Sequence, residues 1–353
     1  MKIVAIDMGK SKSVARMYEG QDKPQRLETI RTDPQSFHDL LAKEQPERVL
    51  IEIGPAAGWV CDLCQALGMA IKVANTSDEP WRWRKLKSKS DEKDTAKLLK
   101  LELLGELKEV HVPEAKVRQW RQLIGYRQAV VSKVTEAKNR IRGILECRGL
   151  RLASGDRAWS EAGCEEIRKM ARDLKETTQD DLWRGMVQLE LEAMVYLKGQ
   201  LEQVEAKLEQ IAQADKRVAL LQSAPGVGRR IGEMVVAMID KPERFTRGRT
   251  VGVWAGLTPR RFQSGQMELE GHISHCGSAQ LRQLLIQGCW SGLRKEGWIK
   301  WTFDRISAGN KKRRRLAIVA VARRLLVRLW AMLRDGTSWR KEELTNGTRT
   351  AAA

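Results

Sequence analysis

Two short stretches of sequence decide the fold of the first third of this chain: Lys2-Ile-Val-Ala-Ile-Asp7 and Arg48-Val-Leu-Ile-Glu-Ile53. Each is an apolar run of the length typical of a buried strand. Each also carries an acidic residue, Asp7 or Glu52, near its carboxyl end. The two runs therefore predict an apolar sheet with carboxylates where its strands end.

The segments around these two runs indicate the order of the sheet. Residues 13–18 and 26–31 are predicted to be strands, Asp33-Pro34 is a helix-start signal, a second helix is predicted from about residue 58, and residues 70–73 form a last strand. Three strands, helix, strand, helix, strand is the order of an RNase H-like (RuvC-like) α/β fold. The first and fourth strands are neighbours in that fold, so Asp7 and Glu52 are expected to lie side by side.

A second pair of acids follows further along the chain. Ser90 is a favourable helix N-cap, which places Asp91 and Asp94 in the first turn and on one face of a helix. Carboxylate oxygens suit Mg²⁺, and two such ions can activate an attacking oxygen and stabilise a leaving oxygen at a phosphodiester. Each acid alone could be an ordinary surface carboxylate, but together they predict a magnesium centre.

The charge balance indicates the class of partner. The chain has 64 Lys and Arg against 45 Asp and Glu, a formal net charge of +19. An excess of this size favours binding to a polyanion such as nucleic acid, although a basic protein without that role is the alternative. No apolar run approaches the roughly 18 residues of a membrane span, and the first residues lack the layout of a signal peptide, so a cytoplasmic protein without a membrane partner is expected.

A stretch in the last third has the features of a phosphate-reactive loop. Residues 256–265 read Gly-Leu-Thr-Pro-Arg-Arg-Phe-Gln-Ser-Gly, which sets Arg260 and Arg261 ahead of Ser264. The glycine after the serine predicts a turn and allows a bulky group to approach, while guanidinium groups offer forked donors to phosphate. An ordinary solvated loop is the alternative interpretation.

Other segments supply candidate nucleic-acid contacts. Residues 81–90 interleave tryptophan with basic residues, a pattern that suits base stacking and phosphate binding or, equally, core anchoring. Residues 220–235 resemble a helix-hairpin-helix element, whose glycine amides can bind backbone phosphate. The candidate contacts are Arg82, Arg84, Lys87, Lys89, Gly226, Gly228, Arg282, Lys311, Lys312 and Arg313.

Two long helices are predicted in the middle of the chain, over residues 114–148 and 187–211. The second carries Met194, Leu197, Leu201, Val204, Leu208 and Ile211 at the alternating spacing of a coiled-coil seam. Such a seam needs a partner. Either the first long helix of the same chain or the same helix of a second subunit could supply it.

These motifs resemble those of insertion-sequence transposases with a DEDD metal centre and a serine nucleophile, a family also described as bridge-RNA-guided recombinases. The resemblance rests on residues 6–10, on Glu52 with Gly54-Pro55, on residues 89–96, and on residues 225–228, 255–265 and 277–282. Together with the sequence patterns, it predicts a DEDD domain over 1–110, a helical coiled-coil region over 111–215, a mainly α serine transposase domain over 216–340 and a disordered tail over 341–353.

The resemblance also implies roles and partners. Asp7, Glu52, Asp91 and Asp94 would bind Mg²⁺, and Ser264 would form a covalent phosphoserine link to DNA. The family holds donor and target DNA in a dimer of dimers, completes the metal domain of one subunit with the serine domain of another, and takes its target choice from a structured bridge RNA. A DNA invertase without a guide RNA and a non-catalytic nucleic-acid-binding protein are the alternatives.

Overall fold

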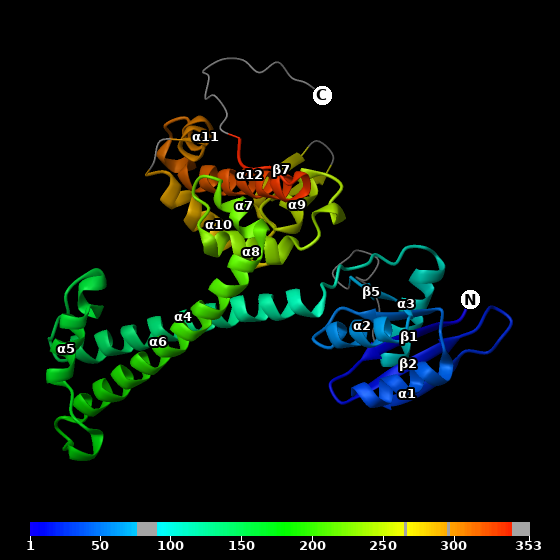
Figure 1. Cartoon of the computed structure of the whole chain (residues 1–353), viewed down its shortest axis with the longest axis horizontal. Coiled ribbons are helices and arrows are strands. Elements are labelled where there is room, and N and C mark those ends of the chain that lie inside the picture. Colours follow the sequence, from blue (N-terminus) through cyan, green and yellow to red (C-terminus); the bar gives the residue numbers. More distant parts are fainter. Residues whose placement is uncertain (76–89, 265–266, 295–296, 341–353) are drawn as a thin grey trace. The chain divides into compact units, whose positions relative to one another are not determined.

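The computed structural model describes residues 1–75, 90–264, 267–294 and 297–340 (Figure 1). The chain divides into two compact units, Met1–Gln119 and Trp120–Ala353. The predicted middle region, 111–215, falls in the second unit except for its first residues. The predicted disordered tail, 341–353, lies outside the described residues.

The first unit is built on a mixed sheet of five strands in the order β3-β2-β1-β4-β5. Strands β1 and β2 pair antiparallel, as do β2 and β3, whereas β1–β4 and β4–β5 are parallel. This topology confirms the predicted order of elements and the predicted neighbours β1 and β4. The strands are β1 (Ile3–Met8), β2 (Lys12–Tyr18), β3 (Arg26–Arg31), β4 (Arg48–Glu52) and β5 (Ala70–Ala74).

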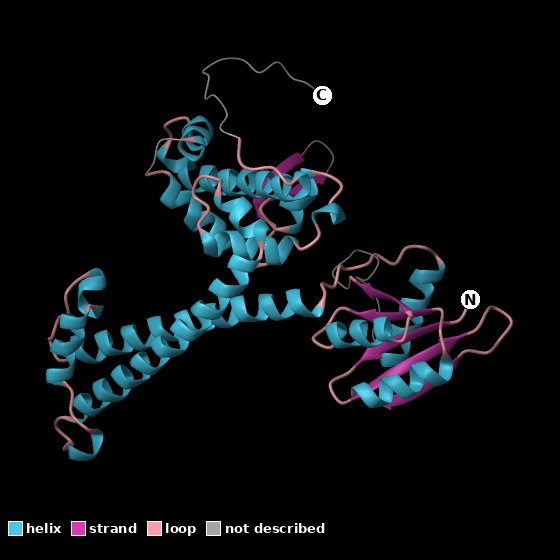
Figure 2. Ribbon diagram, viewed as in Figure 1, coloured by secondary structure: helices cyan, strands magenta, loops and turns pink. Residues whose placement is uncertain are grey.

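Helices cover both faces of this sheet because the central strands are apolar on both faces (Figure 2). The helices are α1 (Pro34–Glu44), α2 (Ala57–Ala66) and α3 (Asp91–Leu103). Val4 and Ile6 belong to the apolar cluster that also contains residues of α1 and α2. Ile3 and Ala5 belong to a second cluster, which contains Leu98 and Leu99 of α3. Because side chains alternate along a strand, odd-numbered residues of β1 face α3.

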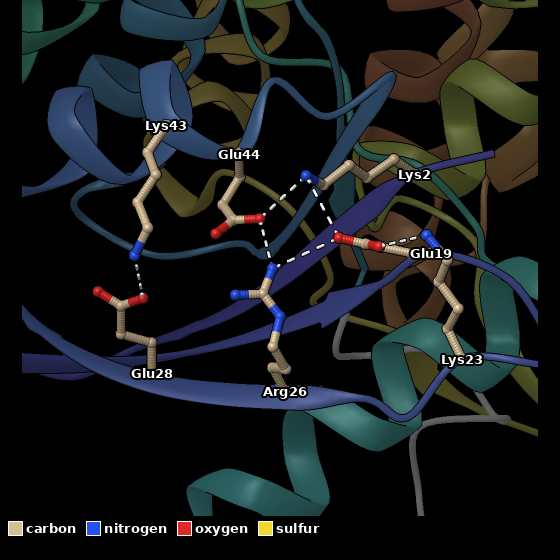
Figure 3. A network of polar contacts seen from close by, with 7 residues as sticks. All are labelled: Lys2, Glu19, Lys23, Arg26, Glu28, Lys43 and Glu44. Atoms are coloured by element: carbon tan, nitrogen blue, oxygen red, sulfur yellow. Dashed lines mark hydrogen bonds and ion pairs between the residues drawn. The ribbon is translucent and has the colours of Figure 1, made fainter.

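A charge network fixes the end of α1 to the sheet (Figure 3). Glu44 is only 3% exposed and accepts contacts from Lys2 at 3.0 Å and from Arg26 at 2.8 Å. Burial acts to raise the pKa of Glu44, but the hydrogen bonds from Lys2 and Arg26 outweigh it, so the pKa lies below the ordinary value. Glu19 joins the same network through Lys2 and Lys23.

Two long helices, α4 (Ala115–Glu146) and α6 (Leu182–Ala214), contact each other in the same chain. Arg127 on α4 pairs with Glu205 on α6, and Arg140 pairs with Glu190, which makes the helices antiparallel. Seam residues of α6 share apolar clusters with α4: Val204 and Leu208 with Trp120 and Ile124, and Met194 with Val134, Ala137 and Ile141. The described helix α4 therefore packs against this seam. A supercoiled geometry stays a prediction.

A shorter helix, α5 (Glu161–Met170), packs between the ends of these long helices. Its Cys164 and Ile167 join the apolar cluster formed by α4 and α6. The sequence predicted only two long helices in this region, with no helix between them. The helix is nevertheless N-capped by Ser160, which accepts a hydrogen bond from the amide of Gly163 at 3.2 Å.

The rest of the second unit is mainly helical and surrounds α12 (Arg314–Asp335) (Figure 1). Residues of α12 such as Val321, Leu325 and Leu329 are fully buried against the neighbouring helices. The other elements are α7 (Lys216–Gln222), α8 (Arg229–Ile239), α9 (Gly248–Trp254), β6 (Pro259–Ser264), β7 (Met267–Ile273), α10 (Ala279–Gly292) and α11 (Trp298–Ser307). Short 3-10 helices cover Gly155–Trp159, Leu174–Glu176, Pro242–Arg244 and Lys311–Arg313. Across the described residues, no helix is long and apolar enough to cross a membrane.

Candidate active site

Asp7 and Glu52 occupy matching positions at the carboxyl ends of neighbouring strands. The parallel register pairs Ile6 of β1 with Ile51 of β4, so the next residue of each strand is one of these acids. Both acidic residues are half-buried. The predicted juxtaposition of the two positions is therefore present in the sheet.

The two acids also share one face of the sheet. Ala5 and Leu50, two residues before each acid, are buried in the cluster that contains α3 residues. Side chains two residues apart on a strand lie on the same face. Asp7 and Glu52 are thus on the side of the sheet that α3 covers.

Helix α3 is fixed to this face at both ends. Near its start, Arg16 of β2 donates to Thr95 Oγ1 at 3.1 Å and to the carbonyl oxygen of Glu92 at 2.8 Å. Near its end, Glu102 is 3% exposed and pairs with Arg48 and with Lys72, the latter at 2.9 Å. No sequence pattern predicted the Arg16 contact, because an isolated arginine in a strand is usually a solvated side chain.

These anchors orient α3 over the sheet. Arg48 is the first residue of β4, so its contact with Glu102 places the end of α3 over the beginning of that strand. The start of α3, with Asp91 exposed and Asp94 half-buried, therefore points toward the strand ends that carry Asp7 and Glu52. Ser90 is at the N-cap position as predicted, but its side chain makes no capping hydrogen bond.

The donor set suits a hard cation, since all four acids offer carboxylate oxygens. Topology assembles Asp7, Glu52 and the first turn of α3 on one face and toward one end of the sheet. Within the part of the chain that the structure describes, no three His, Cys, Asp or Glu side chains are close enough to form a complete metal site. The donor chemistry of the four carboxylates suits Mg²⁺, but the described structure does not bring three of them together into one metal site.

Ser264 is the last residue of β6 and pairs with Met267, the first residue of β7. The sequence predicted a turn here, and the structure places Ser264 immediately before the connection between two antiparallel strands. A register shift between Pro259 and Arg261 marks a β-bulge, a feature that bends a strand and redirects its side chains. The exposed Arg260, inside this bulge, donates to the carbonyl oxygen of Ser274 at 3.1 Å.

The candidate nucleic-acid contacts have differing surroundings. Lys311, Lys312 and Arg313 are exposed in the 3-10 helix directly before α12 and are accessible to a polyanion. Gly226 has a φ of +74°, a backbone conformation that favours glycine without any contact to DNA, and an added Cβ would lie 2.6 Å from Ile299 Cδ1. Gly228 is the exposed N-cap of α8, with open space around it. Arg82, Arg84, Lys87 and Lys89 lie outside the described residues.

Arg282 differs from the other candidates because it is buried, with 7% exposure. Its Nη1 donates to the carbonyl oxygens of Ala255 at 3.1 Å and Gly277 at 3.3 Å, and also to that of Cys276. The expected phosphate contact is not what this side chain makes in the structure. Its guanidinium instead holds the protein's own backbone.

Comparisons with known proteins match both candidate groups. A family model described as "Transposase IS116/IS110/IS902 family" matches residues 218–304, which include Ser264. A model for the DEDD transposase domain of IS110 elements matches residues 4–147, which include the four acids. The chain belongs to the IS110/IS116/IS902 family of transposases.

Individual relatives extend along most of the chain. The protein y4rJ of Sinorhizobium fredii, named as a candidate transposase, is 26% identical over 316 residues, which cover 82% of this chain and 78% of the relative. A second protein of that organism, y4pF/y4sB, likewise named, is 23% identical over 352 residues, covering 97% and 87%. The transposase for insertion sequence element IS1111A of Coxiella burnetii is 26% identical over 282 residues, covering 78% and 74%.

Proposed function

We propose that this transposase cuts and rejoins DNA through Ser264 as the nucleophile, assisted by Mg²⁺ bound to Asp7, Glu52, Asp91 and Asp94. The observation that supports this proposal best is the parallel pairing of β1 and β4, which aligns Asp7 with Glu52 on the face covered by α3. A family of strand-transferring enzymes and a net charge of +19 agree with a DNA substrate.

The four carboxylates would hold the metal, which when bound would stabilise negative charge at the scissile phosphate. Asp7 and Glu52 are held by a sheet whose interior is apolar, whereas Asp91 and Asp94 are held by a helix anchored through Arg16 and Glu102. A rigid support of this kind lets carboxylates keep their positions during chemistry.

Ser264 would attack the phosphorus atom of one DNA strand. The bond from its Oγ to phosphorus would form as the bond to the leaving DNA oxygen breaks, and the hydroxyl proton would finally reside on that oxygen. The phosphoserine diester keeps the energy of the original bond, so the reverse attack by a DNA hydroxyl can rejoin strands. Arg260 and Arg261 would neutralise charge on the phosphate.

The two groups of residues belong to different units of the chain, the acids to residues 1–119 and Ser264 to residues 120–353. The proposal therefore includes completion of one subunit's acids by another subunit's serine, in a dimer that assembles into a tetramer on donor and target DNA. A mixture of Asp7→Asn and Ser264→Ala proteins tests this. Activity regained on mixing supports sharing across subunits, and no recovery argues for a site within one chain.

Trapping of a protein–DNA adduct tests the nucleophile. Wild-type protein, incubated with Mg²⁺, target DNA and copurified RNA, is expected to form a denaturant-resistant DNA adduct that maps to Ser264 by peptide mass spectrometry. Ser264→Ala should abolish the adduct, whereas Ser291→Ala, an exposed serine on α10, should leave it unchanged. An adduct formed by Ser264→Ala at the wild-type level would disprove the assignment.

Target choice by a bridge RNA is the remaining part of the proposal. It rests on the family resemblance and on the basic character of the chain. Sequencing the RNA that copurifies with the protein tests it directly. One abundant structured species encoded beside the gene supports guidance, whereas random fragments would favour the alternative, an invertase that acts without a guide.

A further inference from the structure

The β6–β7 hairpin that carries Ser264 has an unusually close contact at its base. Gly256 and Gly277 both have left-handed backbone conformations, with φ of +67° and +64°. A Cβ at Gly256 would lie 2.6 Å from the amide nitrogen of Cys276 and would clash with its carbonyl oxygen, and a Cβ at Gly277 would clash with the carbonyl oxygen of Trp254. The segments entering and leaving the hairpin therefore touch backbone to backbone, at a distance that only glycine permits.

Arg282 joins the same two segments. Its Nη1 donates to Ala255 on the entering segment and to Cys276 and Gly277 on the leaving segment. The residue is 7% exposed, so these carbonyl oxygens replace the water that would otherwise solvate the charge. Removal of the guanidinium would leave the buried carbonyl oxygen of Ala255 without this donor and would break the link from Ala255 to Cys276 and Gly277.

The arginine is itself held by a rigid element. It lies in the first turn of α10, where the Ser278 hydroxyl accepts a hydrogen bond from the amide of Leu281 at 3.2 Å. Leu281 and Leu285 of the same helix are fully buried in the main core of the second unit. Arg282 thus connects the base of the hairpin to a helix that is fixed in this core.

The hairpin needs such an anchor because of its length. A two-stranded hairpin is marginally stable by itself. Its six-residue strand β6 extends from Pro259 to Ser264, and at about 3.3 Å per residue the serine lies roughly 17 Å along the strand from its beginning. A small rotation at the base therefore becomes a displacement of a few ångströms at the serine.

We propose that Arg282 is a positioning residue for Ser264: by fastening Ala255 to Cys276 and Gly277, it sets the direction in which the hairpin carries the serine toward DNA. This inference rests on the proposed role of Ser264 as the nucleophile. It assigns to Arg282 no contact with the DNA itself. A misplacement of about 1 Å can cost roughly a hundredfold in rate, so a loosened base should slow the chemistry far more than it weakens DNA binding.

The test compares Arg282→Met, which keeps bulk but removes the donors, with Arg282→Lys and with Arg121→Met. Arg121 is the matched control, because it also donates to two backbone carbonyls, Ala237 at 2.7 Å and Met238 at 3.1 Å, at the end of α8. Three quantities are measured on the folded fraction of each full-length protein: DNA affinity, the rate of adduct formation at saturating DNA, and hydrogen exchange of peptides within residues 259–273.

Arg282→Met is expected to slow adduct formation by about tenfold or more, to change DNA affinity less than about twofold, and to speed exchange in the hairpin. Arg282→Lys, which retains one cationic donor, should recover part of the rate. Arg121→Met should lower stability without changing the adduct rate per folded molecule. A rate loss that only parallels loss of folded protein, or an equal loss in both Met variants, would overturn the positioning role.

Hydrogen exchange separates a failure of this inference from a failure of the proposed function. If wild-type protein forms no adduct at Ser264, the nucleophile assignment is wrong, and exchange in residues 259–273 still decides whether Arg282 holds the hairpin. Unchanged exchange in Arg282→Met would overturn the inference on its own. Faster exchange with an unchanged adduct rate would show that Arg282 anchors the hairpin without positioning the serine.

Discussion

The strand ends that carry Asp7 and Glu52 and the hairpin that carries Ser264 are supported in opposite ways. The acids follow apolar strands in a sheet covered by helices on both faces, so many contacts fix each position. Ser264 is at the far end of two strands that, among the described residues, pair with each other and with no other strand. At the base of this hairpin, Gly256, Gly277 and Arg282 hold the entering and leaving segments together. The acid group should therefore tolerate single structural changes better than the serine group.

The largest effect is expected from Asp7→Asn, a substitution that should disturb neither the sheet nor the base of the hairpin. Asp7→Asn keeps the size of the side chain but removes its charge, and activity should fall by at least about a hundredfold, since even outer partners of metal ligands are worth 10- to 100-fold. DNA cleavage assays at several Mg²⁺ concentrations measure the loss. Asp39→Asn, an exposed acid on α1, is the control. Near-normal cleavage by Asp7→Asn would remove Asp7 from the metal set.

A change at the hairpin base should sharpen the contrast between the two regions. Gly277→Ala places a Cβ in a left-handed conformation and against the carbonyl oxygen of Trp254. We expect a loss of about 2 kcal/mol or more in unfolding free energy, of which about 1–2 is the conformational cost alone. Urea unfolding measures it.

Gly143→Ala is the control, because it should raise the free energy of unfolding where Gly277→Ala lowers it. Gly143 lies within α4 with open space around its Cα, and alanine there should stabilise the helix by about 0.5–1 kcal/mol. Equal effects of the two substitutions would mean that the close contact at Gly277 carries no strain for a larger residue.

In the first unit, the contact between the end of α3 and the sheet can be weakened by a substitution of Glu102. Burial acts to raise the pKa of Glu102, but hydrogen bonds from Lys72 and Arg48 outweigh it and hold the pKa below its ordinary value. Glu102→Gln should lower the unfolding free energy by about 1–3 kcal/mol at pH 7. A carboxyl group with a lowered pKa stabilises the fold above its unfolded pKa and loses that contribution as the pH falls through the folded value.

The difference between wild type and Glu102→Gln should therefore shrink below about pH 4.3, the ordinary glutamate pKa. Urea unfolding of both proteins at pH 7 and at successively lower pH values gives the comparison. A difference that stays constant into this acidic range would show that the ion pairs of Glu102 contribute no stability.

The smallest effect is expected from a substitution of Arg16, which fastens the start of α3 to the sheet. Arg16→Met removes the donors to Thr95 and Glu92 but leaves the apolar contacts of α3 with the sheet. We expect about a tenfold loss of DNA cleavage and about 1 kcal/mol of stability. Arg31→Met is the control, because the Arg31 side chain is 83% exposed. A loss as large as that of Asp7→Asn would show that the acid group, too, depends on a single contact.

Local sequence patterns were sufficient for the sheet and insufficient for the hairpin. The apolar runs ending in Asp7 and Glu52 predicted both strands and their pairing, because burial on both faces leaves few other arrangements. Strand β6 reads Pro-Arg-Arg-Phe-Gln-Ser and has no apolar alternation, so only a turn could be expected. Helix α5 was missed for a similar reason, since much of its sequence is charged.

The contacts of individual arginines were the least predictable part of the site. Arg282 stands 27 residues from Ala255, and Arg16 stands 79 residues from Thr95. Contacts between residues so far apart along the sequence produce no local sequence pattern. In a basic chain, basic residues are therefore first interpreted as phosphate contacts. For Arg282 that interpretation missed the burial of the side chain, which only the packing of α10 determines.

The closed base of the hairpin has a consequence for protein engineering. Gly256 and Gly277 bring the two ends of the segment between them into direct contact. The β6–β7 hairpin could therefore be exchanged as one unit, because the place where it joins the rest of the protein would not change. This segment should accept sequences from related chains, provided that Ser264, Arg260, Arg261, the two glycines and Arg282 are retained. A library confined to residues 259–273 would thus vary the reach of the serine while the helical scaffold stays constant.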